Sequence, residues 1–109
     1  MEKSIDPVVL AIDSGSSSEL ARYFDSSISL NISGQQGDYS RSQAELVLKD
    51  FFKKNPPMGF SLVFKSENNP STSSYIGEYA SGGGSYKVFI KANQQGSQMK
   101  VYSLEFVKA

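Results

Sequence analysis

The clearest pattern of apolar and polar positions lies in residues 39–57. Apolar side chains recur there at the spacing of one helix face, at Ala44, Val47, Leu48, Phe51 and Phe52. Ser40 and Gln43 have the spacing of a capping box at the start of a helix. Pro56 and Pro57 end it, because proline lacks an N–H and disfavours helical geometry in the residue before it. The pattern predicts an amphipathic helix whose apolar face needs a broad apolar cover.

Two shorter helices are predicted before this one. Asp6 is suited to cap the first helix, Pro7 suits its first position and Gly15 ends it. A serine among residues 16–18 is suited to cap the second, whose apolar face runs to about Phe24.

A period of two replaces the helical period elsewhere and predicts strands at residues 27–33, 60–67, 75–81, 85–93 and 98–108. Phe60, Leu62 and Phe64 are expected on one face of their strand. The connections are predicted to be a loop at residues 34–38 and turns at residues 68–74, 82–84 and 94–97.

The last predicted strand changes phase partway along. A one-residue bulge near Tyr102 and Ser103 would place three apolar side chains on one face, namely Val101, Leu104 and Phe106. The order is therefore helix, helix, strand, helix and four strands. It predicts a single α+β domain over residues 1–109, with a curved antiparallel sheet packed on one face by helices.

Composition removes several classes of function. The chain of 109 residues has 11 basic and 11 acidic residues, so its neutral balance predicts neither nucleic-acid binding nor attraction to an anionic membrane. It has no cysteine and no histidine, which excludes disulfides, zinc–thiolate sites and the usual general base near neutral pH. No membrane-spanning segment, metal site or cofactor is expected.

The stretch at residues 20–32, LARYFDSSISLNI, and the stretch at residues 39–52, YSRSQAELVLKDFF, resemble the nuclear transport factor 2-like superfamily, also called cystatin-like. The aromatic–acidic pair Phe24 and Asp25, and the double aromatic of Phe51 and Phe52, carry much of this resemblance. Within the superfamily the chain is similar to a small bacterial group, domain-of-unknown-function family 4783, most specifically at KDFFKKNPP in residues 49–57.

The resemblance implies a cone, in which a helix lies across a strongly bent sheet and leaves a pocket at the open end. It also implies an exported protein, although no signal peptide is visible in this sequence. Superfamily enzymes place a carboxylate base in the pocket, often with a tyrosine or histidine. This chain departs from that pattern because it has no histidine.

Five residues are candidates to line a ligand pocket: Tyr23, Asp25, Tyr75, Tyr79 and Tyr86. For Asp25 the alternative interpretation is a turn residue that binds nearby backbone N–H groups. The tyrosines are equally typical of half-buried strand positions. Glu78 and Glu105 are typical of cross-strand pairs on a solvated face, although either would suit a buried base. Residues 82–84, three glycines, indicate a hairpin turn and not a phosphate-binding loop.

The leading hypothesis is a non-catalytic domain that binds a small apolar ligand or a partner protein, with no catalytic residue assigned. One alternative is an isomerase- or dehydratase-like enzyme that uses a pocket carboxylate with a tyrosine. Another is a structural homodimer that associates through the outer face of the sheet.

Overall fold

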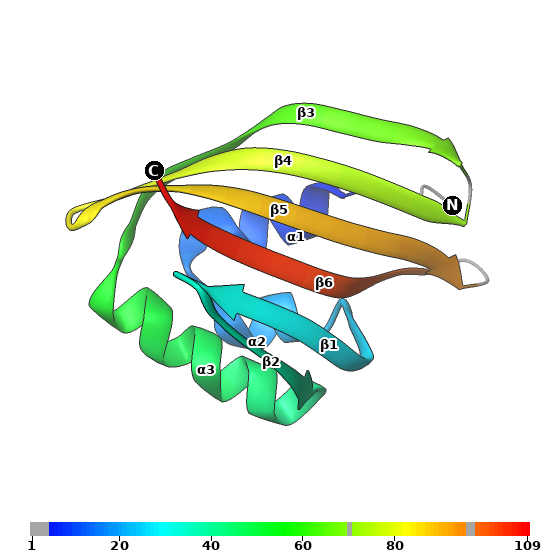
Figure 1. Ribbon diagram of the computed structural model, residues 1–109, viewed down its shortest axis with the longest axis horizontal. Coiled ribbons are helices and arrows are strands. Elements are labelled where there is room, and N and C mark those ends of the chain that lie inside the picture. The colour runs from blue at the N-terminus through cyan, green and yellow to red at the C-terminus, as the bar shows by residue number, and fades with distance from the viewer. Residues whose placement is uncertain (1–4, 70, 96–97) are drawn as a thin grey trace.

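The computed structural model describes residues 5–69, 71–95 and 98–109. In this part of the chain three helices precede or interrupt six strands, in the order α1 (Asp6–Ser14), α2 (Ser17–Ala21), β1 (Phe24–Ile32), β2 (Gln35–Ser40), α3 (Arg41–Lys54), β3 (Pro57–Asn69), β4 (Thr72–Ser81), β5 (Gly84–Gln95) and β6 (Gln98–Lys108). Figure 1 shows the curved sheet with α1 and α2 behind it and α3 running beneath β1. The α+β architecture predicted from the pattern is confirmed.

Helix α3 confirms the main sequence prediction. The Ser40 side chain accepts a hydrogen bond from the backbone N–H of Gln43, and the Gln43 side chain accepts one from the backbone N–H of Ser40. Leu48, Phe51 and Phe52 are buried, so the apolar face of the helix packs against the core.

The first two helices differ from prediction at their ends. Helix α1 begins at Asp6 itself, so the capping position falls on Ile5, whose side chain makes no capping hydrogen bond. Gly15 ends α1 in a left-handed conformation, and Ser16 caps α2, as predicted. Helix α2 stops at Ala21 instead of running to Phe24, because the chain there joins the sheet: Phe24 pairs with Val101 of β6.

The predicted loop at residues 34–38 is wrong, since strand β2 occupies most of it and forms a hairpin with β1. Ser33 and Gly34 both have positive φ, which is the geometry of a tight two-residue hairpin turn. Strand β2 lies at the edge of the sheet, and Tyr39 is its one side chain that packs against the core, so it has no apolar alternation for a pattern to detect.

The six strands follow the order β2-β1-β6-β5-β4-β3. All neighbours are antiparallel except β1 and β6, which pair in parallel, so the sheet is not purely antiparallel as predicted. The predicted bulge in β6 is confirmed: Lys91 pairs with Ser103 and Ala92 with Val101, which leaves Tyr102 as the extra residue. Val101, Leu104 and Phe106 are accordingly all buried.

Strand β3 corrects another prediction. Phe60 is buried and Leu62 is half-buried, but Phe64 is 50% exposed and lies on the opposite face. A register shift between Leu62 and Phe64 makes Val63 an extra residue and reverses the phase of the strand. The predicted turns at residues 68–74 and 94–97 include Pro70, Gly96 and Ser97, which lie outside the described residues.

Side chains from all three helices and from the inward face of the sheet form one apolar core.

None of the helices in the described ranges has the length and apolar character that crossing a bilayer requires.

Candidate functional site

Aromatic side chains pack together between α3 and the inward face of β4, β5 and β6. Five rings pack there with neighbouring centroids 4.6 to 6.5 Å apart: Phe51, Phe52, Tyr79, Tyr86 and Phe106. Each of these rings is at most 6% exposed. The sequence pattern predicts that Phe51 and Phe52 lie on the apolar face of their helix, but it does not predict that these five rings of the aromatic cluster meet.

Two of the predicted pocket tyrosines bind the end of α3. The Tyr79 hydroxyl donates to the backbone carbonyl of Asn55 at 2.5 Å, and the Tyr86 hydroxyl donates to Oδ1 of Asn55 at 3.2 Å. Asn55 is the C-cap of α3, and its backbone N–H and its side-chain Nδ2 both donate to the carbonyl of Phe51. Burial, with a smaller effect of the nearby Tyr86, raises the pKa of Tyr79 to about 12, so this hydroxyl stays protonated and donates.

Tyr75 lies on a different part of β4 from the aromatic cluster. It is 1% exposed, and its hydroxyl donates to Oε2 of Glu67 at 2.6 Å. Burial and, next, this hydrogen bond raise the pKa of Tyr75 to about 12, while a hydrogen bond with Ser73 acts in the opposite direction. Glu67 itself is exposed, so the pair joins a buried phenol to a solvated carboxylate.

Tyr23 and Asp25 lie apart from those tyrosines, where α2 leads into β1. The carbonyl of Tyr23 accepts a hydrogen bond from the N–H of Val101. Asp25 lies at the irregular start of β1, where it accepts from the N–H of Ser26 at 2.8 Å and from Nε2 of Gln95 at 3.1 Å. The structure therefore brings together Tyr79 and Tyr86, and places Tyr23, Asp25 and Tyr75 elsewhere.

The carboxylates of the described residues are all at least partly exposed. Glu78 forms a cross-strand ion pair with Lys87 at 4.0 Å, and Glu105 accepts a hydrogen bond from Asn31 at 3.2 Å. A buried carboxylate beside a tyrosine hydroxyl, which the isomerase hypothesis requires, is not found in residues 5–69, 71–95 and 98–109. The same residues contain no cluster of acidic side chains suited to hold a metal ion.

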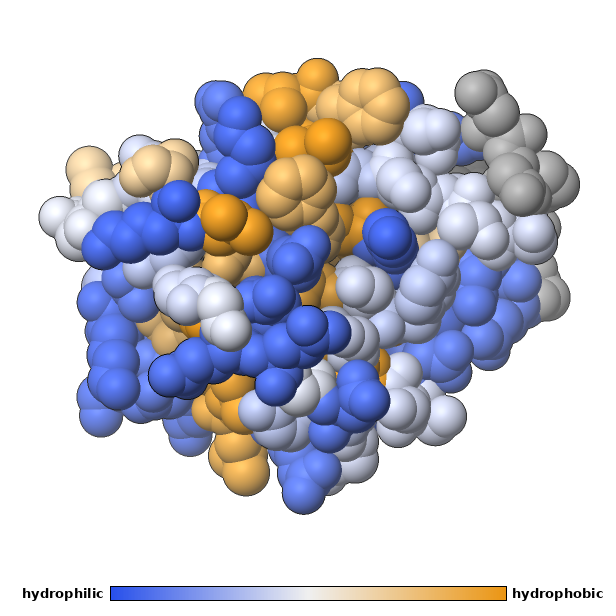
Figure 2. All heavy atoms as spheres, viewed as in Figure 1, coloured by the Kyte–Doolittle hydropathy of each residue, from blue (hydrophilic) through white to orange (hydrophobic). Residues whose placement is uncertain are grey.

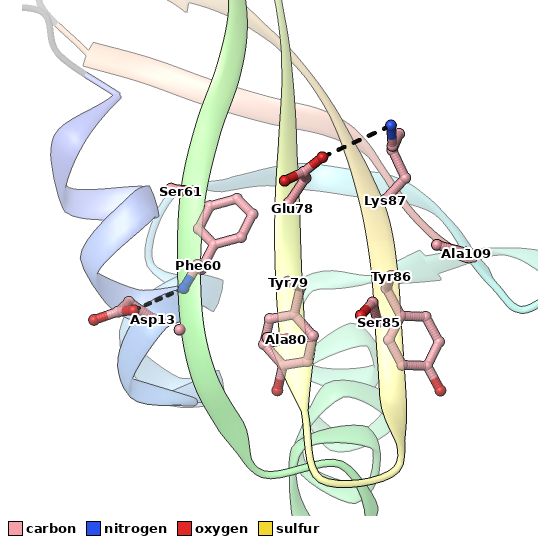
Figure 3. A pocket seen from close by; sticks show the side chains of 11 residues that line it. Asp13, Phe60, Ser61, Glu78, Tyr79, Ala80, Ser85, Tyr86, Lys87 and Ala109 are labelled. Carbon is pink, nitrogen blue, oxygen red and sulfur yellow. Dashed lines mark hydrogen bonds and ion pairs between the residues drawn. The ribbon is translucent and has the colours of Figure 1, made fainter.

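Two hollows lie near the aromatic cluster. One of about 310 Å³ lies between α3 and the ends of β1 and β5, with Ile32, Val47, Phe51, Lys54 and Tyr86 among its walls. The other, of about 590 Å³, reaches the outer face of β3, β4 and β5, with Ser61, Glu78, Ala80, Ser85 and Lys87 among its walls. Figure 3 shows the ion pair of Glu78 and Lys87 on that side of the sheet, and Asp13 reaching the backbone of Phe60 from α1.

The outer face of the sheet carries a continuous apolar row. Phe64 pairs with Ile76 across β3 and β4, and Ile76 pairs with Phe89 across β4 and β5, so the three side chains stand side by side. Two further apolar side chains are exposed, Val63 on β3 and Val107 on β6. Figure 2 shows apolar atoms gathered over β3, β4 and β5 on this face.

Sequence reasoning found only part of this apolar row. The alternation in β5 places Phe89 outward between two lysines, Lys87 and Lys91. The alternation in β3 groups Phe64 with Phe60 and Leu62 on one face, because the bulge at Val63 leaves no signal in the pattern. No sequence pattern singles out Ile76, which lies between Tyr75 and Gly77.

The comparisons with known proteins agree with this architecture. A family described as Domain of unknown function (DUF4783) matches residues 5–106. No curated protein matches the chain. A crystal structure of a DUF4783 family protein from Bacteroides ovatus is 23% identical with a TM-score of 0.92, covering 100% of this chain and 98% of that one.

More distant structures show the wider fold group. An NTF-2 like protein of unknown function from Silicibacter pomeroyi is 16% identical with a TM-score of 0.71, covering 96% of this chain and 89% of that one. A domain of unknown function with a cystatin-like fold from Nostoc punctiforme is 10% identical with a TM-score of 0.73, covering 95% and 72%. With its NTF2-like fold and a match over nearly its whole length, the chain belongs to the DUF4783 family.

Proposed function

We propose that the protein is a non-catalytic interaction domain whose working surface is the outer face of the sheet and whose partner is a second copy of the chain. The observation that carries this is the apolar row of Phe64, Ile76 and Phe89. The interior is occupied by the aromatic cluster, whereas this row stands on a surface that no described element covers. Phe64 is 50% exposed, and Ile76 and Phe89 are half-buried, so the row forms a contiguous apolar strip at the surface, a feature that marks interaction sites.

The outer side chains of β4 and β5 are complementary, so the two strands can pair with each other in a two-fold dimer. Ile76 and Phe89 are both apolar, while Glu78 and Lys87 have opposite charges. A two-fold axis that runs along the strands, between β4 and β5, would exchange these two strands. Ile76 then packs on Phe89 of the second copy, and Glu78 faces Lys87 of the second copy. Every such contact occurs twice, as in an isologous interface.

The first test replaces one apolar side chain of the row. The wild-type chain is expected to sediment as a dimer at micromolar concentration, and Phe89→Glu as a monomer, because a carboxylate at the centre of the interface must lose its hydration when the two faces pair. Leu46→Glu is the matched control, since Leu46 is 65% exposed but lies on α3. A monomeric wild-type chain, or dissociation by Leu46→Glu as well, would contradict the proposal.

The second test uses the charged pair. Glu78→Lys places like charges opposite each other twice and is expected to weaken pairing by more than about tenfold, and Lys87→Glu should act in the same way. The double variant Glu78→Lys with Lys87→Glu restores opposite charges and should restore the dimer. If the double variant stays as weak as the single ones, the proposed axis is wrong.

A second candidate function is binding of a small apolar ligand, which the hollow of about 310 Å³ beside α3 supports. Its volume lies at the lower end of the usual range for ligand sites, about 300–1,000 Å³. Thermal unfolding against a panel of small apolar compounds tests it, because saturating ligand raises the unfolding temperature. A stabilising compound whose effect disappears in Val47→Glu supports this site, and a flat panel with a working positive control contradicts it.

A further inference from the structure

A side chain from α1 occupies the open edge of the sheet. Strand β3 is outermost in the strand order, so one side of its backbone faces away from β4. Oδ1 of Asp13 accepts the backbone N–H of Phe60 at 2.9 Å. Figure 3 shows this contact, with Asp13 reaching from α1 to β3. The N–H that a neighbouring strand would use as a donor is therefore already bonded within the chain.

The position of Asp13 in α1 is unfavourable for a carboxylate. It lies in the last turn of α1, where the helix dipole disfavours a negative charge, and that turn contains no basic residue. Helix formation alone gives no reason for an acid at this position. The hydrogen bond to β3 gives one.

The edge that Asp13 reaches is unusually apolar. Met58 is 75% exposed and Val63 is 56% exposed, and each is the extra residue at a register shift of β3. Edge strands commonly carry charges, prolines or bulges that prevent pairing with other chains, because their free backbone groups and apolar side chains promote it. Here the bulges are present, but their extra residues are apolar, so the strand itself contributes little charge at these points.

The geometry points to Asp13 as a built-in block of strand addition, which keeps β3 from pairing with β3 of a second copy. A second copy is the relevant strand because it carries the same exposed apolar side chains and is always present at the chain's own concentration. An antiparallel ladder over the start of β3 needs the Phe60 N–H as a donor, and the Asp13 carboxylate holds it. Loss of the acceptor leaves this N–H free to pair with another strand.

The edge pairs through backbone groups of β3, whereas the proposed dimer uses side chains on the outer face of β4 and β5, so the inference stands independently of the proposed function. One self-pairing face closes a dimer, whereas two self-pairing surfaces on one chain allow open-ended assemblies. The experiment is therefore made in two backgrounds, the wild-type chain and Phe89→Glu, which lacks the sheet-face contact.

Asp13→Ala removes the acceptor, whereas Asp13→Asn keeps an oxygen that can accept the same N–H. In the Phe89→Glu background, Asp13→Ala is expected to roughly double the mean mass in sedimentation, because one edge pairs with one edge. In the wild-type background it should form larger species that bind thioflavin T. Asp13→Asn should behave like the parent chain in both backgrounds, and so should the control Asp50→Ala, which removes an exposed acid from α3.

Hydrogen exchange at the Phe60 amide separates the block from a general loss of stability. The amide is expected to be protected in the parent chain and in Asp13→Asn, exposed in dilute Asp13→Ala, and protected again in its assemblies. Val88→Ala, a core variant, serves as a destabilised chain with an intact edge and should not assemble. The inference is overturned if Asp13→Ala keeps the mass of its parent, or if Val88→Ala assembles to the same extent.

Discussion

The hydroxyl of Tyr79 donates a 2.5 Å hydrogen bond to the backbone carbonyl of Asn55 and so ties the middle of the sheet to the end of α3. Tyr79 is fully buried, and its ring also packs on Phe51 and Phe52 of the same helix. Tyr79, a candidate ligand contact in the sequence, thus has a structural role: it joins the sheet to the end of α3.

Tyr79→Phe keeps the ring and removes only the hydrogen bond. The carbonyl of Asn55 then loses its partner, which is expected to lower the free energy of unfolding by about 1–3 kcal/mol. Urea denaturation measures this loss. Tyr102→Phe is the matched control, because Tyr102 is half-buried in the bulge of β6, and it should change stability by less than about 0.5 kcal/mol. Equal losses in the two variants would show that the bond to Asn55 contributes nothing specific.

Stability at alkaline pH is the second prediction. The pKa of Tyr75 and that of Tyr79 are both raised to about 12 in the folded chain, against about 10 in an unfolded one. Between these values the folded chain holds protons that the unfolded chain releases. The contribution is fully present below about pH 10 and is lost as the pH rises from about 10 to about 12.

Urea midpoints measured at several pH values across this window should therefore fall as the pH rises. The double variant Tyr75→Phe with Tyr79→Phe lacks both groups and should fall less steeply than the wild-type chain. The same slope in both chains would mean that other groups, such as the lysines, cause the whole effect.

The difference between what the sequence predicted and what the structure shows has physical causes in particular elements. Helix α3 was predicted almost to the residue because its cap, its period and its prolines all indicate the same boundaries. Strand β2 was missed because an exposed edge strand needs no apolar alternation. The inner and outer faces of β3 were confused because a bulge reverses the phase of a strand without changing which residue types it contains.

The sequence also predicts only part of the candidate site. Strand parity groups Tyr75, Tyr79 and Tyr86; of these, Tyr79 and Tyr86 pair directly across β4 and β5, whereas the Tyr75 hydroxyl binds Glu67. The partner of Tyr79 and Tyr86, Asn55, is far away in sequence, and no local pattern indicates a contact between a helix cap and two strands. Contacts of this kind depend on the packing angle of α3, which becomes known only when the fold is complete.

The capping box of α3 provides the third prediction. Ser40→Ala removes the acceptor for the Gln43 N–H and is expected to cost about 1 kcal/mol of unfolding free energy. Lys49→Ala, at an exposed position farther along the helix, is the control and should be near neutral, because alanine favours helices. Thermal unfolding of both variants checks this. A neutral Ser40→Ala would show that packing of the apolar face fixes the helix start without the cap.

Gly77 provides the fourth prediction, because it lies under the ring of Phe60. A Cβ atom there would lie 2.5 Å from two ring carbons of Phe60 and 2.9 Å from the backbone carbonyl oxygen of Ser61. The ring has room to turn only if the core repacks, and the carbonyl belongs to the paired strand β3, so β3 and β4 must separate locally. Gly77→Ala is therefore expected to lose about 1–3 kcal/mol of unfolding free energy, as overpacked core positions do.

Gly82→Ala is the control, since a Cβ at Gly82 would meet nothing within 4 Å. If urea denaturation gives equal values for the two variants, the close approach of Phe60 to β4 is not a constraint on the fold. A loss confined to Gly77→Ala would instead show that a glycine is required where the edge strand bends over the sheet, beside the bulge that turns Phe64 outward.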